Sequence, residues 1–155
     1  DADHALIGAV LADMVTGAEK PDAQLEPHID TINEWMAGDD LAAIHARVLG
    51  WQGDDVWLGR ARDGLAHGSP LAATWIFRQL NQTLSASLEE VFESELILGC
   101  NIMRHPEFAE GVRALLVDKD RSPAWTYGDL ASVPAAVVDT FFTAPSAMPA
   151  LALPE

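Results

Sequence analysis

The sequence has 155 residues, with 24 acidic and 9 basic side chains and a formal net charge of −15. Nucleic acids and anionic lipid surfaces bind proteins through basic patches, so this charge excludes both as the main partner. Hydrophobic residues make up 49% of the sequence, but no apolar run approaches the roughly 20 residues that a membrane-spanning helix needs. These features predict a soluble chain, without a membrane partner, that is long enough to build one hydrophobic core.

The cysteine content bears on the compartment. A single cysteine, Cys100, excludes an internal disulfide and a cluster of thiolate metal ligands. One thiol suits a reducing compartment, and no basic segment followed by an apolar stretch marks an export signal. We therefore expect a cytoplasmic protein. The chain begins at Asp1 on a helical pattern, as expected for a piece of a longer protein or for a chain from which a tag has been removed.

Helical periodicity opens the sequence. We expect a first helix that ends near Gly17, a linker near 17–24, a second helix over about 25–36, and a third that is capped by Asp39 or Asp40 and ends at Gly50. The apolar stripes of these three helices are Leu6, Ile7, Val10, Leu11 and Met14, then Ile29, Ile32, Trp35 and Met36, then Leu41, Ile44 and Val48.

Stronger helix signals follow. A fourth helix is expected over about 54–66, closed by Gly68. Ser69 and Pro70 form an N-cap and a first-turn proline that open a fifth helix, and Ser87 and Glu90 form an S-x-x-E capping box that opens a sixth. The apolar residues expected to mark these helices are Val56, Leu58 and Leu65, then Leu71, Trp75 and Leu80, then Leu88, Val91, Phe92, Leu96, Gly99 and Met103.

The segment 106–125 begins as a short amphipathic helix. Phe108, Val112 and Leu115 share one face, and Pro106 stands at the helix start, where a missing N–H costs nothing. Gly111 interrupts this pattern, and a glycine inside a helix costs about 1 kcal/mol relative to alanine. We therefore expect another group to approach the backbone of Gly111 closely.

The same segment ends in four consecutive charges, 118–121, followed by Ser122 and Pro123. This ending is either a solvated exit loop or a place where Lys119 is held out to meet an anion. Charge runs are usually solvated surface, which favours the exit loop on spacing alone. Lys119 is one of only two lysines in the sequence.

The remaining sequence predicts one further helix around Val133 to Phe142, followed by a proline-containing tail. Taken together, the patterns predict an all-α protein with about seven to eight helices. We expect one helical domain over residues 1–143 and a flexible tail over residues 144–155.

The sequence carries no recognisable catalytic constellation. It lacks the G-x-S-x-G, glycine-rich phosphate-loop and H-E-x-x-H motifs. Glu95 falls on the apolar stripe of the sixth helix, where a carboxylate must find hydrogen-bond donors or have a shifted pKa. Glu95 is therefore either a catalytic residue or, more commonly for such a position, the partner of a structural residue such as an arginine. Five histidines are too scattered to predict a metal site, namely His4, His28, His45, His67 and His105.

Several segments resemble one family. SP at 69–70, RQL at 78–80, SLEEVFESE at 87–95 and PEFAEGVRALLVDKDRSPAW at 106–125 resemble the C-terminal part of 3-hydroxyisobutyryl-CoA hydrolases, and EPHIDTINEWM at 26–36 resembles the preceding helical region. These thioesterases of valine breakdown belong to the enoyl-CoA hydratase/isomerase, or crotonase, superfamily. The resemblance covers about 26–142. Hydratases of the superfamily show a looser motif in which arginine follows the lysine, so Asp120 after Lys119 favours the hydrolase branch.

The resemblance implies that the catalytic groups lie outside this chain. In that family, a two-donor oxyanion hole polarises the thioester carbonyl and acidic side chains move the protons, and all these groups belong to an N-terminal β/α half that no residue here matches. The resemblance therefore implies that this chain is the C-terminal helical region of a crotonase-type α/β enzyme without its catalytic core. No catalytic residue is expected in the chain, and the chain alone is expected to be inactive.

The resemblance also implies a binding role. Lys119 matches a lysine that lies near the CoA nucleotide in related hydratases, and a long cationic side chain suits a 3′-phosphate. Coenzyme A arrives as part of the substrate, so no separate cofactor and no metal are expected. The helices are expected to cover the active site and to supply contacts of a homo-oligomer.

Two other functions stay open on the sequence. The first is an enoyl-CoA hydratase or isomerase of the same superfamily, which the acidic residues of the upstream sequence would distinguish. The second is a stand-alone helical interaction module that reuses a crotonase-type C-terminus.

Overall fold

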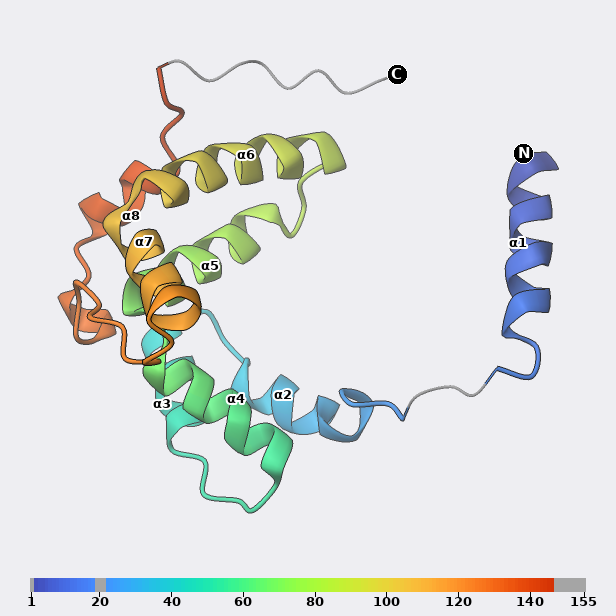
Figure 1. Ribbon diagram of the computed structural model, residues 1–155, viewed down its shortest axis with the longest axis horizontal. Helices are drawn as coiled ribbons and strands as arrows, with labels where there is room; N and C mark the ends of the chain where they lie inside the picture. The colour runs from blue at the N-terminus through green and yellow to red at the C-terminus, as the bar shows by residue number, and fades with distance from the viewer. Residues whose placement is uncertain (1, 19–21, 147–155) are drawn as a thin grey trace. The chain divides into compact units, whose positions relative to one another are not determined.

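The computed structural model describes residues 2–18 and 22–146, and these residues form eight α-helices and no strand (Figure 1). The all-α class predicted from the sequence is therefore confirmed. The chain divides into two compact units, residues 1–36 and residues 37–155. No helix of the described residues has the length and apolarity needed to cross a membrane.

The first unit contains α1 (Ala2–Val15), a 3₁₀ turn η1 (Glu26–His28) and α2 (Ile29–Trp35). The first helix stops before Gly17, whose φ of 82° lies in the left-handed region that glycine adopts without strain. The apolar stripe of α1, from Leu6 to Met14, is exposed to solvent. Residues 19–21 of the predicted linker 17–24 lie outside the described residues.

The second unit holds the remaining elements. They are α3 (Leu41–Leu49), α4 (Val56–His67), α5 (Pro70–Thr83), α6 (Leu88–Arg104), α7 (Pro106–Val112), a π-helical turn η2 (Arg113–Val117), a 3₁₀ turn η3 (Leu130–Ser132) and α8 (Ala135–Phe141). Of the predicted tail 144–155, only 144–146 are described. The domain boundary at residue 143 stays a prediction.

Side-chain caps explain where the helices of the second unit begin. Backbone N–H groups in the first turns of α3, α4 and α5 donate to the side chains of Asp40, Asp55 and Ser69 at 2.9–3.0 Å. At the start of α6, Ser87 and Glu90 form the reciprocal capping box. Each cap satisfies N–H groups that have no partner within the helix. The helix starts predicted from Asp39 or Asp40, from Ser69 and from the Ser87–Glu90 box are confirmed, whereas the cap at Asp55 was not predicted.

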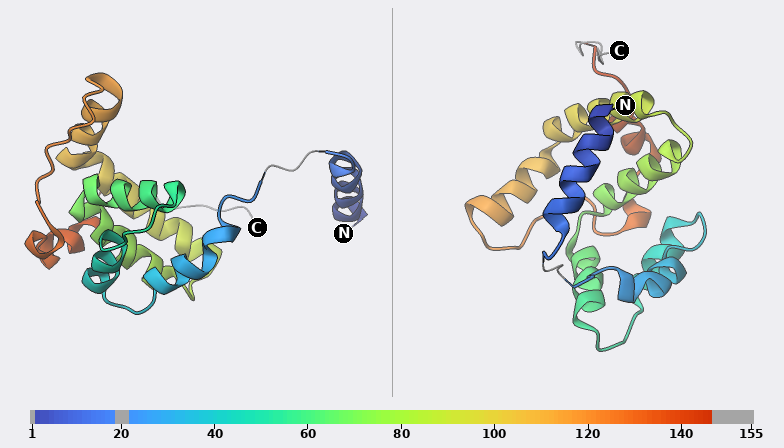
Figure 2. Two further views of the ribbon diagram at one scale, coloured as in Figure 1. Left: turned by 90° about the horizontal axis from the view of Figure 1, so that it is seen from below. Right: turned by 90° about the vertical axis from the view of Figure 1, so that its right-hand side faces the viewer.

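The core lies among α5, α6 and α8. Helices α5 and α6 run side by side in opposite directions, and α8 packs against both (Figures 1 and 2). Four side chains form the buried centre, with Trp75, Ile102 and Tyr127 among the residues packed around it: Leu71, Leu98, Val138 and Phe141. Leu71 is only 1% exposed. Burial of aliphatic and aromatic side chains is the main source of stability here, because each contributes roughly 1.5–3 kcal/mol.

Polar contacts fasten α8 to this pair. The side-chain amide of Asn101 in α6 donates to three backbone carbonyls at the end of α8, of Thr140, Phe141 and Thr143, at 2.9–3.1 Å. The last carbonyls of a helix lack partners within it, so one amide satisfies an end that would otherwise need water. On the other side, Arg78 of α5 pairs with Asp139 at 2.5 Å.

The predicted inward face of α6 is wrong for half of its six members. Leu88 is 71% exposed, Met103 is 70% exposed and Phe92 is also exposed, whereas Leu98, which the prediction omitted, is buried in the core. Leu80 of α5 and Leu84, which directly follows α5, are exposed as well. Helical periodicity reports a side of a helix that is apolar, but α5 and α6 carry more apolar surface than the described residues cover.

The core predicts a large difference between two leucine-to-alanine variants. Leu71→Ala should lower the free energy of unfolding of the chain by about 2–5 kcal/mol, because it leaves a cavity in a packed core. The matched control is Leu84→Ala at a site that is 83% exposed, where we expect a change below about 0.5 kcal/mol. Urea unfolding monitored by circular dichroism measures both. Equal losses in the two variants would contradict the assigned core.

Candidate functional site

The candidate site is built from α7, η2 and the loop that follows, which together hold the conspicuous segment 106–125. Pro106 occupies the first helical position of α7, as predicted, and His105 accepts a hydrogen bond from the N–H of Glu107 at 3.3 Å. The π-helical turn then carries the chain into residues 118–125, which fold back along α7. Three residues of α7 and η2 contact this returning loop, and each is described in turn.

Glu107 is the first of them and is buried. One carboxylate oxygen accepts the hydroxyl of Ser69 at 2.5 Å, and the other accepts the N–H of Thr126 at 2.8 Å. A buried carboxylate is stable only when its oxygens find donors, and here both do. Glu107 thus joins the start of α5 to the end of the loop and acts as a structural residue.

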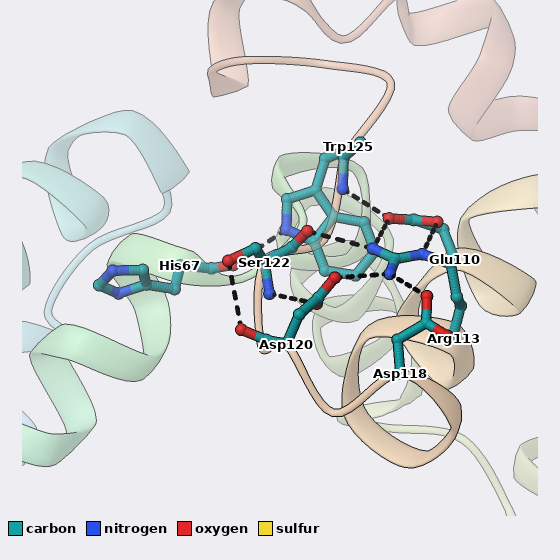
Figure 3. Close-up of polar contacts among 8 residues, drawn as sticks. His67, Glu110, Arg113, Asp118, Asp120, Ser122 and Trp125 are labelled. Atoms are coloured by element: carbon teal, nitrogen blue, oxygen red, sulfur yellow. Dashed lines mark hydrogen bonds and ion pairs between the residues drawn. The ribbon is translucent and has the colours of Figure 1, made fainter.

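Gly111 is the second contact. A Cβ atom at this position would lie 3.3 Å from the ring of Trp125, which is tighter than ordinary van der Waals contact. The indole N–H of Trp125 donates to the carbonyl of His67 at 2.9 Å, at the end of α4 (Figure 3). The expected close approach to Gly111 is confirmed, and the approaching group is Trp125.

Arg113 is the third contact and has the most partners (Figure 3). Its Nε and Nη2 donate to the two oxygens of Glu110 at 2.9 and 2.7 Å. Its Nη1 donates to both Asp118 and Asp120 at 2.7 Å, and Nη2 also donates to the carbonyl of Ser122 at 3.2 Å. A guanidinium group has five N–H donors in a rigid fork, and every one of them is used here.

The charges in this cluster stabilise each other. The guanidinium of Arg113 and the N–H of Ala124 lower the pKa of Glu110 to about 2. Hydrogen bonds from Arg113 and from the N–H of Ser122 lower the pKa of Asp120, while Glu110 above all raises the pKa of Arg113. Glu110 and Asp120 therefore stay charged well below neutral pH, beside a guanidinium that stays protonated.

Lys119 lies at the turn of this loop. Lys119 and Arg121 both have positive φ angles, 58° and 56°, a conformation that costs a non-glycine residue about 1–3 kcal/mol. The N–H of Asp118 bonds the carbonyl of Arg113 and that of Arg121 bonds the carbonyl of Ala114, so the turn is held at both ends. Lys119 is exposed, and no ion pair joins it to any described residue.

An open cavity of about 720 Å³ lies beside this loop, between α5, α7 and η2. Its wall is mainly apolar and includes Leu71, Trp75 and Leu115, while Arg121 lies at the loop side. The buried carboxylate in the wall, Glu107, already has both oxygens bonded. The cavity therefore suits an apolar group and offers no unpartnered buried carboxylate for proton transfer.

The other candidate residues do not join this site. Glu95 is exposed, so it does not need the buried partner expected for it. In the described residues, no three His, Cys, Asp or Glu side chains are grouped so that they could hold a metal ion. Glu107 was missed by the sequence analysis, although glutamate in the first turn after Pro106 is a favourable position beside the positive end of a helix.

Comparison with known proteins identifies the family. The sequence matches the enoyl-CoA hydratase/isomerase family over residues 1–142. The chain belongs to this family. The resemblance seen in segments 69–70, 87–95 and 106–125 is thereby confirmed at the level of the superfamily.

Curated relatives in the enoyl-CoA hydratase/isomerase family are identical to this chain at about a third of the aligned positions. A protein named mitochondrial 3-hydroxyisobutyryl-CoA hydrolase from Danio rerio is 32% identical over 77% of the chain and 34% of its own length. The proteins of the same name from Gallus gallus and Homo sapiens are 31% and 36% identical, over 76% and 70% of the chain. The chain spans about a third of the length of the curated relatives it matches.

Solved structures of the family share the fold of the chain. An enoyl-CoA hydratase from Rhodobacter sphaeroides 2.4.1 matches with a TM-score of 0.69 and 28% identity, over 91% of this chain and 43% of that one. A carnitinyl-CoA dehydratase from Mycobacterium thermoresistibile matches with a TM-score of 0.72 and 26% identity, over 94% and 42%. This partial coverage fits the prediction that the chain is the helical region of a crotonase-type enzyme.

The relatives correct the expected location. The hydrolases that match this chain are named as mitochondrial, so the cytoplasmic location expected from the sequence is wrong by this comparison. The argument failed because a single cysteine indicates a reducing environment and does not distinguish between the compartments that have one.

The contact between Gly111 and Trp125 predicts different outcomes for two glycine-to-alanine variants. Gly99→Ala in α6 should raise the free energy of unfolding by about 0.5–1 kcal/mol, since alanine favours helix and nothing lies within 4 Å of the new Cβ. Gly111→Ala should gain less or lose stability, because the ring of Trp125 must move. Urea unfolding of both variants gives the comparison. An equal gain at both sites would contradict the close contact.

Proposed function

We propose that the complete protein containing this chain hydrolyses the thioester of 3-hydroxyisobutyryl-CoA, a step of valine breakdown, and that this chain is its C-terminal helical region. The supporting observation is the 31–36% identity to proteins named 3-hydroxyisobutyryl-CoA hydrolase. The chain spans only about a third of those relatives. The oxyanion hole and the acidic catalytic residues therefore belong to the rest of the protein, and the chain alone is inactive.

Within this proposal, Lys119 contacts the 3′-phosphate of the CoA nucleotide. The geometry supports the role, because Lys119 is exposed on a turn that is bonded at both ends and has no ion-pair partner among the described residues. An unpaired ammonium group on a held backbone can meet a phosphate at little conformational cost. The substrate brings coenzyme A with it, so the proposal needs no separate cofactor. The proposal also includes a homo-oligomer.

The alternative is a hydratase of the same family. It is favoured by the two solved structures, which are named as a hydratase and a dehydratase at 28% and 26% identity. The two reactions differ in which bond reacts. A hydrolase adds water across the thioester carbonyl and releases a carboxylic acid and the free thiol of coenzyme A, whereas a hydratase adds water to a carbon–carbon double bond and leaves the thioester intact.

An assay of the complete protein distinguishes these functions. We expect incubation with 3-hydroxyisobutyryl-CoA to release free thiol, which a thiol reagent detects by absorbance. A short-chain enoyl-CoA serves as the second substrate, and we expect no loss of its double-bond absorbance. Double-bond hydration without thiol release would support the hydratase instead. Measurable turnover by the 155-residue chain would contradict the proposal that the catalytic residues lie in the rest of the protein.

Lys119→Gln should weaken binding of the substrate without slowing the chemical step. We expect KM for 3-hydroxyisobutyryl-CoA to rise about fivefold, because an exposed ion pair contributes up to about 1 kcal/mol, and kcat to stay within about twofold. The matched control is Arg60→Gln, which removes the same charge from an exposed position in α4.

The same thioester built on 3′-dephospho-CoA completes the test of Lys119. The wild-type protein should lose affinity for this substrate, while the Lys119→Gln variant should be indifferent to the missing phosphate, since the two partners form one interaction. A KM that is unchanged in Lys119→Gln, or that rises equally with both substrates, would refute the contact with the 3′-phosphate.

A further inference from the structure

Lys119 lies between two aspartates in the sequence, and a lysine in this position would ordinarily form an ion pair with one of them. A lysine flanked by carboxylates on a tight turn pairs with one of them or has its field cancelled by both. Here both flanking carboxylates, Asp118 and Asp120, instead accept hydrogen bonds from the same nitrogen, Nη1 of Arg113, at 2.7 Å. Arg113 thereby takes up the negative charge on either side of the lysine.

The local charge balance matters because the chain as a whole carries −15. An anion that approaches the chain meets a repulsive field over most of the surface. Between Glu110 and Arg121 the sequence has three acidic and three basic residues, so this segment is neutral overall. Without Arg113 the same segment would be net negative, and the ammonium of Lys119 would stand between two unpaired carboxylates.

Arg113 also fixes the shape of the turn. The positive φ angles of Lys119 and Arg121 are unfavourable for residues with side chains and persist only where neighbouring contacts impose them. Figure 3 shows the hydrogen bonds from Arg113 to Asp118, Asp120 and the carbonyl of Ser122. These acceptors lie on both sides of Lys119 in the sequence. Glu110 anchors the guanidinium from the opposite direction with two further bonds.

We propose that Arg113 is the positioning residue for phosphate recognition at Lys119: it holds the two flanking aspartates and so leaves the lysine ammonium free and correctly placed for a phosphate of the acyl-CoA substrate. This inference rests on the proposed function, because it assigns a role to Arg113 in the same contact. Arg113 itself does not touch the substrate. Its effect on phosphate binding comes from its hydrogen bonds to Asp118 and Asp120, the residues on either side of Lys119.

Arg113→Lys in the complete protein tests the proposal. Lysine keeps the positive charge but has three donors and no planar fork, so it cannot hold Glu110, Asp118 and Asp120 together. We expect KM for the CoA thioester to rise about threefold, no more than in Lys119→Gln, with kcat within about twofold. The matched control is Arg60→Lys, an exposed arginine in α4, for which no change is expected.

Two comparisons separate positioning from a merely structural role. With the 3′-dephospho-CoA thioester, Arg113→Lys should behave as the wild-type protein does, because no phosphate remains to be recognised at Lys119. In the double variant with Lys119→Gln, Arg113→Lys should add no further rise in KM. Equal losses with both substrates, or a fall in kcat, would show that Arg113 serves only the fold and would overturn the proposal.

Failure of this proposal and failure of the proposed function give different results. If Lys119→Gln raises KM and Arg113→Lys does not, the phosphate contact stands and the role of Arg113 is refuted. If neither variant changes KM, the contact of Lys119 fails and this inference fails with it, whatever the thiol-release assay shows.

A second variant guards against loss of folding in Arg113→Lys. Glu110→Gln leaves Arg113 in place but removes the charge that anchors its guanidinium. We expect the same phosphate-dependent rise in KM, smaller in size, and the same KM as wild type with the 3′-dephospho-CoA thioester. A Glu110→Gln protein with an unchanged KM for both substrates would also overturn the proposal.

Discussion

The arrangement of the segment 106–125 depends on one fully used guanidinium group. Arg113 commits all five of its N–H donors to acceptors on both sides of the turn. Neutral contacts could not do this, because two carboxylates beside each other repel unless a cation lies between them. The five bonds convert a run of charges, which in isolation would be a solvated loop, into a turn with one conformation. The unfavourable backbone of Lys119 is tolerated only because these contacts impose it.

The turn is tied to the hydrophobic core by separate contacts. Glu107 bonds Ser69 at the start of α5, and Trp125 packs on Gly111 and bonds the carbonyl of His67. Ser69 directly precedes α5, which carries Leu71 at the centre of the core. The loop is therefore attached to the packed helices α5, α6 and α8 by hydrogen bonds and by the contact between Trp125 and Gly111. A loop held in this way can keep a charged side chain at a defined place on an otherwise acidic surface.

Local signals in the sequence predicted the helices well and the packing poorly. Caps at Asp40 and Ser69 and the Ser87–Glu90 box depend on residues a few positions apart, so the sequence contains all the information they need. The close approach to Gly111 was also predictable, because a glycine inside a helix needs a reason. The identity of the approaching ring was not, since Trp125 reaches Gly111 only after a turn whose shape depends on Arg113. Likewise, Leu98 rather than Phe92 is buried because burial is decided by neighbouring helices, which periodicity does not specify.

The exposed apolar side chains of α5 and α6 also reflect packing that periodicity does not specify. Leu80 of α5, Leu84 directly after α5, and Leu88 and Phe92 of α6 are exposed, and Leu88 and Phe92 are four residues apart on one face of α6, as on a helix face that is buried against another element. The polar face of a surface helix would show charged residues at these positions. The chain spans about a third of its curated relatives and less than half of the solved structures that share its fold. Exposed apolar side chains gathered on helix faces in this way are typical of surfaces that contact another protein segment or subunit, and the described residues do not cover them.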